Sequence, residues 1–326
     1  MNRDAAIALI RGSKLADRLD RILPHLAPGM RIRTTRAPAA GTALVSRFAG
    51  QGVLPRGAAW PLWDSSAFHQ RWIQYSQTTM AANPGSSKRF WREQIERYEA
   101  QVRDNPKPLN FIAMVRLADT SAHAVELGLP ERGALLFFYD IERCQGSFWP
   151  EARGGWQVIY VPDENDLVLI DESPAHISEF IPSTLTFELQ YSLPDDIRFE
   201  TGDDDLLVYG NEEYERVHGA LLGATQSDQV IHQMRGAPQE VQNGLFHQCQ
   251  LASNGVDCGS PEDNQNPKAA ELAQDAKDWR LVLQIDSDDE GPGWMWGDSG
   301  RLYYCIHRDD LSASRFDRTW CVEQCC

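Results

Sequence analysis

The sequence lacks the short patterns that mark the common cofactor, metal and catalytic sites. Its eight histidines are scattered without an HExxH or HxH pattern, and it contains neither a GxGxxG sequence nor a Walker loop. Cysteine is also sparse, because seven residues in a chain of this size make no disulfide framework. We therefore expect no cofactor, no metal and no catalytic residue, and we interpret the C-terminal CVEQCC, residues 321–326, as reduced, structurally incidental thiols.

Long apolar runs are missing as well. The N-terminal AAIALI ends at Arg11, too short for the core of a signal peptide, and no later run reaches membrane-spanning length. What the chain does have is 42% hydrophobic and 10% aromatic residues, including ten tryptophans, a composition typical of a packed globular protein. We expect a cytoplasmic protein without membrane association.

Basic residues are scarce outside the N-terminal segment. The 326-residue chain has 31 Lys and Arg against 47 Asp and Glu, a formal net charge of −16. Residues 1–47 carry nine basic and three acidic residues, so the remainder carries 22 and 44, a local net of −22. A body this acidic repels nucleic acid and favours cationic partners.

The hydrophobic pattern predicts an α+β fold with mostly antiparallel β-sheets. Helices are expected over 4–26 and, as an insertion, around 88–102, with a Thr/Pro/Ala-rich connector between the first helix and about residue 41. From Leu109 onward seven runs suit strands: LNFIAMVRLAD, GALLFFYDI, WQVIYVPD, DLVLIDE, STLTFELQY, WRLVLQIDS and GRLYYCIHR. Residues 252–275 are interpreted as a long exposed loop whose tail forms a short helix.

Two of these strand pairs echo each other. The segment 114–116 matches 284–286 in pattern, and Gly133-x-Leu135-x-Phe137 matches Gly300-x-Leu302-x-Tyr304. We predict two similar β-rich halves, although hairpins of similar composition could also converge on this pattern. The expected organisation is a basic helix and connector over 1–40, followed by one domain over 41–326 made of repeats at about 41–165 and 166–326.

The stretch PGWMWGDSGRLYY, residues 292–304, contains the GDSG tetrapeptide found around the nucleophilic serine of chymotrypsin-like proteases. A serine nucleophile needs a histidine base and a group that orients it, and no histidine here has a comparable context. Asp-Ser-Gly between strands is ordinary turn chemistry. We predict that Ser299 lies in a turn and is not a nucleophile.

The same region supplies the candidate binding residues. Trp294 and Trp296 face the same side if the segment is extended, and carboxylates surround them. Indoles beside carboxylates can hold a cationic or sugar-like ligand or a partner's arginine, although a core tryptophan beside a solvated loop has the same pattern. A calcium loop is a poor fit, because Pro292 and the tryptophans follow where ligands should be. The full set of predicted binding residues is Trp294, Trp296, Asp298, Asp286, Asp288, Asp289, Gln284 and Trp60.

The C-terminal block, residues 279–320, resembles the domain of unknown function DUF1963, the YwqG-like family. That family has a W-x-L-L-L-Q-(I/L)-D-S-(D/E) strand, an acidic loop and a W-G-D-x-G turn, matched here by WRLVLQIDSDDEGPGWMWGDSG. GQGVLPRGAAWP and HGALLGATQSDQ match more loosely, Met114 replaces a usual glutamine, and the resemblance covers roughly residues 44–320. The resemblance implies a bacterial, soluble α+β protein without established enzymatic activity, and for some members an immunity role beside toxin genes.

Three hypotheses about function remain open. The first is an immunity or antitoxin-like protein that neutralises a basic toxin through an acidic, aromatic-anchored surface. The second is a module that binds a small molecule or peptide in a pocket between the halves, with Gln284, Trp296, Asp298 and Trp60 converging on one cleft. The third is an uncharacterised hydrolase, which would gather groups of shifted pKa in a pocket.

Overall fold

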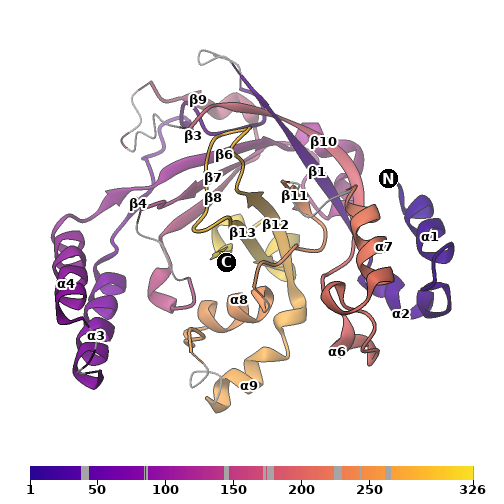
Figure 1. Ribbon diagram of the computed structural model, residues 1–326. Coiled ribbons are helices and arrows are strands. Elements are labelled where there is room, and N and C mark those ends of the chain that lie inside the picture. Colours follow the sequence, from indigo (N-terminus) through magenta and orange to yellow (C-terminus); the bar gives the residue numbers. More distant parts are fainter. Residues whose placement is uncertain are drawn as a thin grey trace.

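The computed structural model describes residues 1–37, 44–83, 85, 87–142, 147–171, 174, 180–223, 230–242, 244–260 and 266–325. One antiparallel sheet dominates this part of the chain, in the order β14-β13-β12-β11-β1-β10-β2-β6-β7-β8 (Figure 1). Its strands are β1 (Ala27–Arg36), β2 (Arg47–Phe48), β6 (Asn110–Arg116), β7 (Ala134–Tyr139), β8 (Trp156–Val161), β10 (Ser183–Ser192), β11 (His232–Arg235), β12 (Trp279–Asp286), β13 (Arg301–His307) and β14 (Trp320–Gln324). Two small pairs, β3 (Val53–Pro55) with β9 (Leu167–Leu169) and β4 (Leu62–Trp63) with β5 (Lys107–Pro108), lie apart from it.

The large sheet curves until its two ends meet, so that it nearly closes into a barrel. At the seam, the indole N–H of Trp156 donates to the carbonyl oxygen of Thr319 at 2.8 Å, and the rings of Trp156 and Trp320 lie 4.8 Å apart. Inside, the rings of Phe137 and Tyr304 make edge contact at 5.0 Å. Closure of this kind removes exposed sheet edges and buries the aromatic inner face.

The halves of the sheet repeat one strand pattern. The β6–β7 and β12–β13 hairpins both contain a register shift near the start of their first strand, at Phe111/Ala113 and Leu281/Leu283. Both hairpins lead into their second strand through a glycine that leaves no room for a Cβ. A Cβ at Gly133 would lie 2.3 Å from the carbonyl oxygen of Val161, and one at Gly300 would lie 2.2 Å from that of Gln324. These carbonyls end the last strand of each half, β8 and β14, so the two close approaches are equivalent.

The register also shows where each repeat begins. In chain order β1, β2, β6, β7 and β8 correspond to β10, β11, β12, β13 and β14. The two first strands are exchanged: β1 pairs with β11 of the second repeat, and β10 pairs with β2 of the first. Because β1 and β10 also pair with each other, an approximate two-fold axis passes near the Arg33–Thr186 pair. The predicted pair of similar halves is therefore present, with β1 as part of the first.

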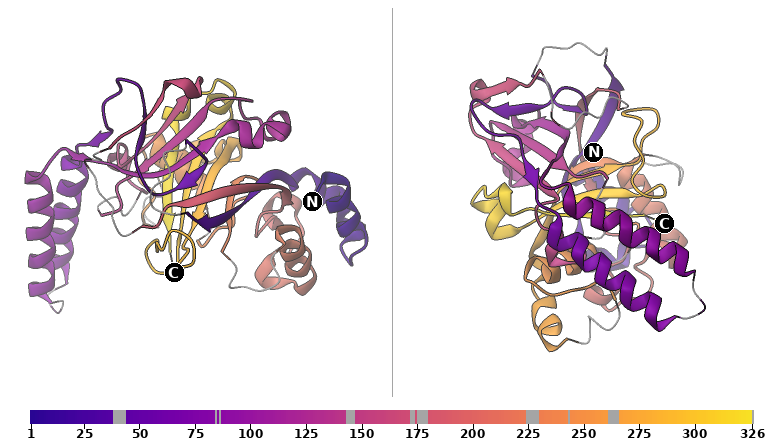
Figure 2. Two further views of the ribbon diagram at one scale, coloured as in Figure 1. Left: turned by 90° about the horizontal axis from the view of Figure 1, so that it is seen from above. Right: turned by 90° about the vertical axis from the view of Figure 1, so that its left-hand side faces the viewer.

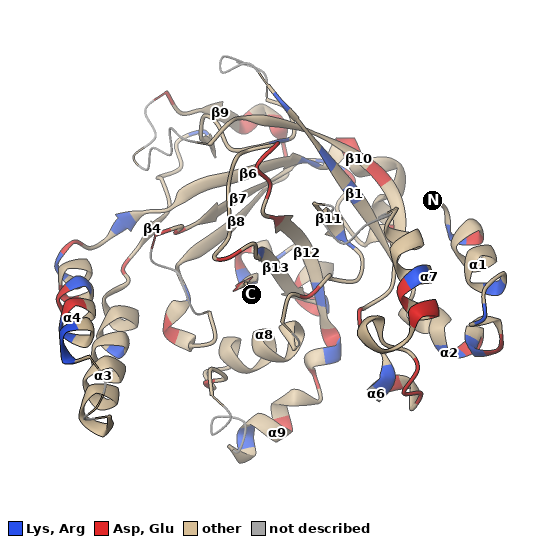
Figure 3. Cartoon of the chain, viewed as in Figure 1, with Lys and Arg blue, Asp and Glu red and all other residues tan. Residues whose placement is uncertain are grey.

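The basic N-terminal segment packs on an acidic part of the same chain. Helices α1 (Arg3–Arg11) and α2 (Leu19–Ile22) share a hydrophobic cluster with α7 (Glu212–Leu222), and α6 (Arg198–Thr201) lies nearby (Figures 1 and 3). Arg18 forms ion pairs with Asp203 at 2.9 Å and Asp205 at 2.8 Å. The positive end of the chain thus meets part of the negative body inside one molecule.

The remaining helices cover the sheet or extend away from it. Helices α3 (Ser66–Ala82) and α4 (Lys88–Arg103) lie side by side as a hairpin that extends from one end of the sheet (Figure 2). Cys249 on α8 (Leu245–Ser253) is fully buried in the main core. The other helices are α5 (Ala124–Leu127), α9 (Pro267–Ala273) and α10 (Arg308–Ser312).

All seven predicted strands are present, and α4 confirms the helix expected around 88–102. The predicted tail helix of the 252–275 segment is α9. Two N-terminal predictions were wrong in detail. The helix over 4–26 is interrupted after Arg11, where Gly12 caps α1 and the chain turns. The supposed connector contains β1, the strand at the centre of the sheet, because its alternating RIRTTR pattern serves a strand better than a linker.

Candidate functional site

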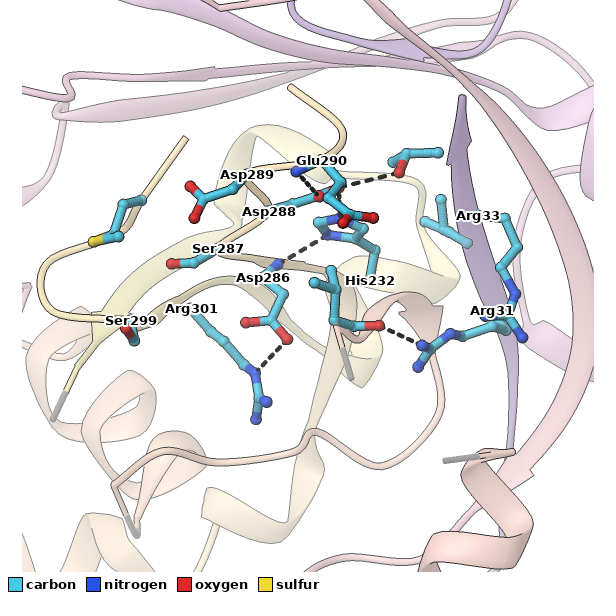
Figure 4. A pocket seen from close by; sticks show the side chains of 14 residues that line it. Arg31, Arg33, His232, Asp286, Ser287, Asp288, Asp289, Glu290, Ser299 and Arg301 are labelled. Carbon is cyan, nitrogen blue, oxygen red and sulfur yellow. Dashed lines mark hydrogen bonds and ion pairs between the residues drawn. The ribbon is translucent and has the colours of Figure 1, made fainter. Parts of the chain in front are cut away.

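A pocket of about 940 Å³ opens beside β1 and the loop that joins β12 to β13 (Figure 4). Side chains from β1, β11, β12, β13 and residues 287–300 surround it. We call it the charged pocket; it is lined by Arg31, Ile32, Arg33, Thr34, Val230, His232, Asp286, Ser287, Asp288, Asp289, Glu290, Met295, Ser299 and Arg301. With three arginines and four carboxylates, it is suited to a polar ligand rather than an apolar one.

Asp288 organises the loop at the mouth of this pocket. Its Oδ1 accepts the backbone N–H groups of Glu290 at 3.1 Å and Gly291 at 2.7 Å, which folds the chain back on itself. Its Oδ2 accepts the hydroxyl of Thr34 and faces Nε2 of His232, each at 3.0 Å. Although burial raises the pKa of Asp288, the bonds from His232 and the Gly291 N–H outweigh it and lower this pKa to about 2. Asp288 is thus a buried carboxylate whose oxygens are already occupied.

The hydrogen bonds of His232 determine which ring nitrogen carries its proton. Nδ1 accepts the backbone N–H of Asp286 at 3.0 Å, so this nitrogen carries a lone pair and the ring proton lies on Nε2, where it is donated to Asp288. The imidazole is 2% exposed. Since neither nitrogen has a lone pair to spare, His232 cannot take a proton from Ser299, and Ser299 itself lies in the turn that the sequence predicts.

The positive side of the pocket comes from β1 and β13. Arg301 forms an ion pair with Asp286, with Nε to Oδ2 at 3.0 Å, and donates from Nη1 to the carbonyl of Gln239 at 2.9 Å. Arg33 extends from β1 with 46% of its side chain exposed. Arg31 differs from both, because its residue is only 3% exposed and its Nε and Nη1 have no hydrogen-bond acceptor among the described residues. Its one hydrogen bond there runs from Nη2 to the carbonyl of Val230.

The predicted site residues fall into three groups: those buried in the core, those that line the pocket and those outside it. The residues buried in the core are structural. Trp294 and Trp296 do face the same side, with rings 5.2 Å apart, but that side is the core, where they are 1% and 2% exposed. The Trp294 indole donates to the carbonyl of Asp286 at 3.0 Å. Gln284 is fully buried; its amide donates to the Ile231 carbonyl and accepts the Gln239 N–H. These three side chains shape the wall from behind and offer no surface to a ligand.

Of the other predicted residues, some line the pocket and some lie outside it. Asp286, Asp288 and Asp289 line it, as the acidic pattern of the loop suggested. Asp298 is exposed and outside the lining. Trp60 lies in the other half, where its indole donates to the Leu109 carbonyl at 2.8 Å. The cleft expected from Gln284, Trp296, Asp298 and Trp60 is therefore not formed, because two are in the core and the others point to different surroundings.

Sequence reasoning missed the basic half of the pocket. Arg31 and Arg33 lie in the segment interpreted as a connector, although their alternation with Ile32 and Thr34 was a signal for a strand with one charged face. His232 belongs to β11, which is only four residues long and gives little pattern. Arg301 was recognised only as part of a strand.

Two arginines of this pocket have uncharged counterparts at the equivalent place beside β10, β2 and β7. Matching registers align Arg31 with Thr184 and Arg301 with Ala134. Asp286 likewise aligns with Arg116. The underlying geometry is nevertheless kept, since the Ser46 hydroxyl accepts the N–H of Arg116 at 2.8 Å where His232 Nδ1 accepts that of Asp286. The fold can be built with uncharged residues at the arginine positions, so architecture does not account for Arg31 and Arg301.

The part of the chain that is described contains no group of three or more His, Cys, Asp or Glu side chains placed to hold a metal ion. None of its helices combines the length and apolar character needed to cross a bilayer.

The fold and site define a two-repeat α+β protein with a charged pocket beside β1. Residues 46–325 match the family model described as Domain of unknown function (DUF1963), and the chain belongs to that family. A comparison with curated proteins found no match.

Proposed function

We propose that this protein is a non-enzymatic binding protein that holds a small polar ligand in the charged pocket. The observation that carries the proposal is the difference between the repeats. Arg31 and Arg301 stand where the equivalent place beside β10, β2 and β7 has Thr184 and Ala134 on the same backbone framework. Charges that a fold does not require, gathered around a pocket of about 940 Å³, support ligand recognition.

Two observations favour binding over hydrolysis in this pocket. The histidine that lines it, His232, has both nitrogens engaged, so Ser299 has no histidine base among the described lining residues. Asp288 is held as an ionised carboxylate by its four partners and is poorly placed to exchange protons near neutral pH.

Neutralisation of a basic partner protein remains a separate proposal with less support. Several of the acids that would attract such a partner are already paired with arginines of this chain. Asp203 and Asp205 meet Arg18, and Asp286 meets Arg301. The two tryptophans offered as anchors are in the core.

The test is to ask whether the pocket retains a compound from a cell extract. The full-length protein is incubated with extract filtered below 1 kDa, recovered by rapid gel filtration and denatured, and the released compounds are identified by mass spectrometry. We expect one compound at near-stoichiometric amounts. Arg31→Thr/Arg33→Thr, which installs on β1 the residues that β10 has at the matching positions, should release none.

A charge-matched control is available on α4. Arg89→Thr/Arg92→Thr removes the same charge far from the pocket and should retain the compound like the unaltered protein. If the unaltered protein retains no compound, or if both double variants retain it equally, the proposed function is wrong.

A further inference from the structure

We propose that the ligand of the charged pocket carries an oxyanion, a carboxylate or phosphate group, and that Arg31 supplies its counter-charge. This inference rests on the proposed function and adds the chemical class of the ligand to it.

Arg31 is a buried charge without a partner in the described chain. Its residue is 3% exposed, it takes part in no ion pair between described residues, and Nε and Nη1 have no acceptor there. A guanidinium carries five N–H donors and is charged at any physiological pH. Leaving such a group buried and unpaired is strongly destabilising, and it is retained where a ligand completes it.

The surroundings of Arg31 increase the need for an anion. Burial, together with the like charges of Arg33 and Arg301, lowers the pKa of Arg31 to about 10, which still leaves it protonated at neutral pH. Asp286 and Glu188 lie close enough to oppose this effect. The Asp286 carboxylate already pairs with Arg301 and accepts the Ile231 N–H, and the Glu188 carboxylate lies 3.9 Å from Nε of Arg33. An oxyanion bound between β1 and Arg301 would face three guanidinium groups, the arrangement in which carboxylates and phosphates bind best.

The opposite wall limits the size and charge of the ligand. Asp289 and Glu290 lie on the loop across from Arg31 and Arg33 (Figure 4), and both are exposed. Their carboxylates would repel a polyanion, so a nucleic acid strand does not fit this pocket. A compact ligand with one or two negative charges can bind the arginines without strong repulsion from the carboxylates of the opposite wall.

The experiment is a titration of the full-length protein with sodium phosphate and, separately, sodium malonate, at ionic strength held constant with sodium chloride. Thermal unfolding is followed by tryptophan fluorescence. We expect at least one anion to raise the melting temperature in a saturable way, because an anion that binds only the folded state stabilises it. In Arg31→Thr the dissociation constant of that anion should rise roughly ten- to hundredfold, as loss of a charged hydrogen-bond donor predicts. A response to phosphate alone or to malonate alone identifies the group.

Without added anion, the two roles of Arg31 predict opposite results. If Arg31 awaits a ligand, Arg31→Thr melts in chloride at or above the temperature of the unaltered protein, since an unpaired buried charge is gone. If Arg31 only supports the fold, the variant melts lower in every buffer. Arg33→Thr is the matched control and should weaken anion binding only severalfold, because Arg33 is half exposed.

Three results would overturn the inference: no saturable response to either anion, a response in Arg31→Thr equal to that of the unaltered protein, or a lower melting temperature of this variant in chloride as well as with anion. If Arg31→Thr does not fold, Arg31→Lys keeps the charge but loses the donors of the guanidinium, and its affinity for the anion should still fall at least severalfold. A neutral or cationic compound retained from the extract would leave the proposed function standing and refute the oxyanion. Anion binding through Arg31 without a retained compound would support the oxyanion site and refute the proposed function.

Discussion

Replacing Asp288 with asparagine exchanges one carboxylate oxygen for an NH₂ group and should destabilise the whole protein. The carboxylate is 4% exposed and accepts four hydrogen bonds, two from backbone N–H groups on Oδ1 and two from Thr34 and His232 on Oδ2. An amide has one oxygen and one N–H₂ group, so in either orientation its donors face donors. His232 cannot relieve the conflict by moving its proton to Nδ1, since that nitrogen accepts the Asp286 N–H.

The size of the effect follows from the pKa of Asp288, which lies at about 2 in the folded protein against an ordinary value of 3.8. A difference of this size corresponds to about 2.5 kcal/mol of stability at neutral pH. The facing donors add to it, so we expect Asp288→Asn to cost about 3–4 kcal/mol. The sign of the pH dependence also follows. Because the folded pKa is lowered, the charge-dependent contribution is complete above about pH 4 and is lost as the pH falls through about 2.

Urea unfolding at several pH values measures both quantities. The midpoint of Asp288→Asn should be lower at pH 7 with an unchanged slope, and its difference from the unaltered protein should shrink between pH 4 and pH 2. Asp289→Asn is the control, because this neighbour is exposed and should shift stability by less than about 0.5 kcal/mol. If Asp288→Asn unfolds within 0.5 kcal/mol of the unaltered protein at pH 7, the hydrogen-bond assignment around His232 is wrong.

Three further predictions concern the same half of the molecule. Gly300→Ala should destabilise by more than about 3 kcal/mol in thermal unfolding, because a Cβ meets backbone there, whereas Gly293→Ala, with open space around its Cβ, should cost only about 1 kcal/mol for its positive φ. Trp296→Ala should lower stability by about 3–5 kcal/mol as a core cavity, while Met295→Ala, 54% exposed, should change the melting temperature little. Burial raises the pKa of Glu240 to about 7, so the folded state loses stability as the pH rises from about 4.5 to 7. The stability of Glu240→Gln should therefore equal that of the unaltered protein at pH 4 and exceed it at pH 8. A constant difference in stability across this pH range would refute the raised pKa.

The strands of this fold were predictable because each is an apolar run of typical length bounded by turn residues. The repeat was predictable for the same reason, since the 114–116 and 284–286 segments occupy matching positions in their hairpins. Two features hid β1. It follows a broken helix instead of a turn, and its burial changes along its length from buried at Met30–Ile32 to exposed near Arg36. A strand whose partners lie 147 or more residues away along the chain leaves little local trace.

The pocket shows a different limit of sequence reasoning. Carboxylates and indoles that cluster in one segment suggested a shared surface, but alternation along an extended segment sends neighbouring residues to opposite sides. Trp294 and Trp296 therefore turn inward while Met295 between them stays exposed. The arginines that complete the pocket come from a strand more than 250 residues earlier, and only the sheet order brings them there.

Part of the uneven charge of the sequence is balanced inside the molecule, and this makes Arg31 more informative. Arg18 meets Asp203 and Asp205, while Arg36 donates to the backbone carbonyls of Asp289 and Gly291 and so holds the acidic loop against β1. The N-terminal arginines are thus used to join distant parts of the fold. Arg31 has the same origin and lies on the same strand, yet in the described chain it has one carbonyl as its partner. Arg33 on the same strand has the Glu188 carboxylate at 3.9 Å, whereas Arg31 has no such partner there, so its missing anion is best supplied from outside the chain.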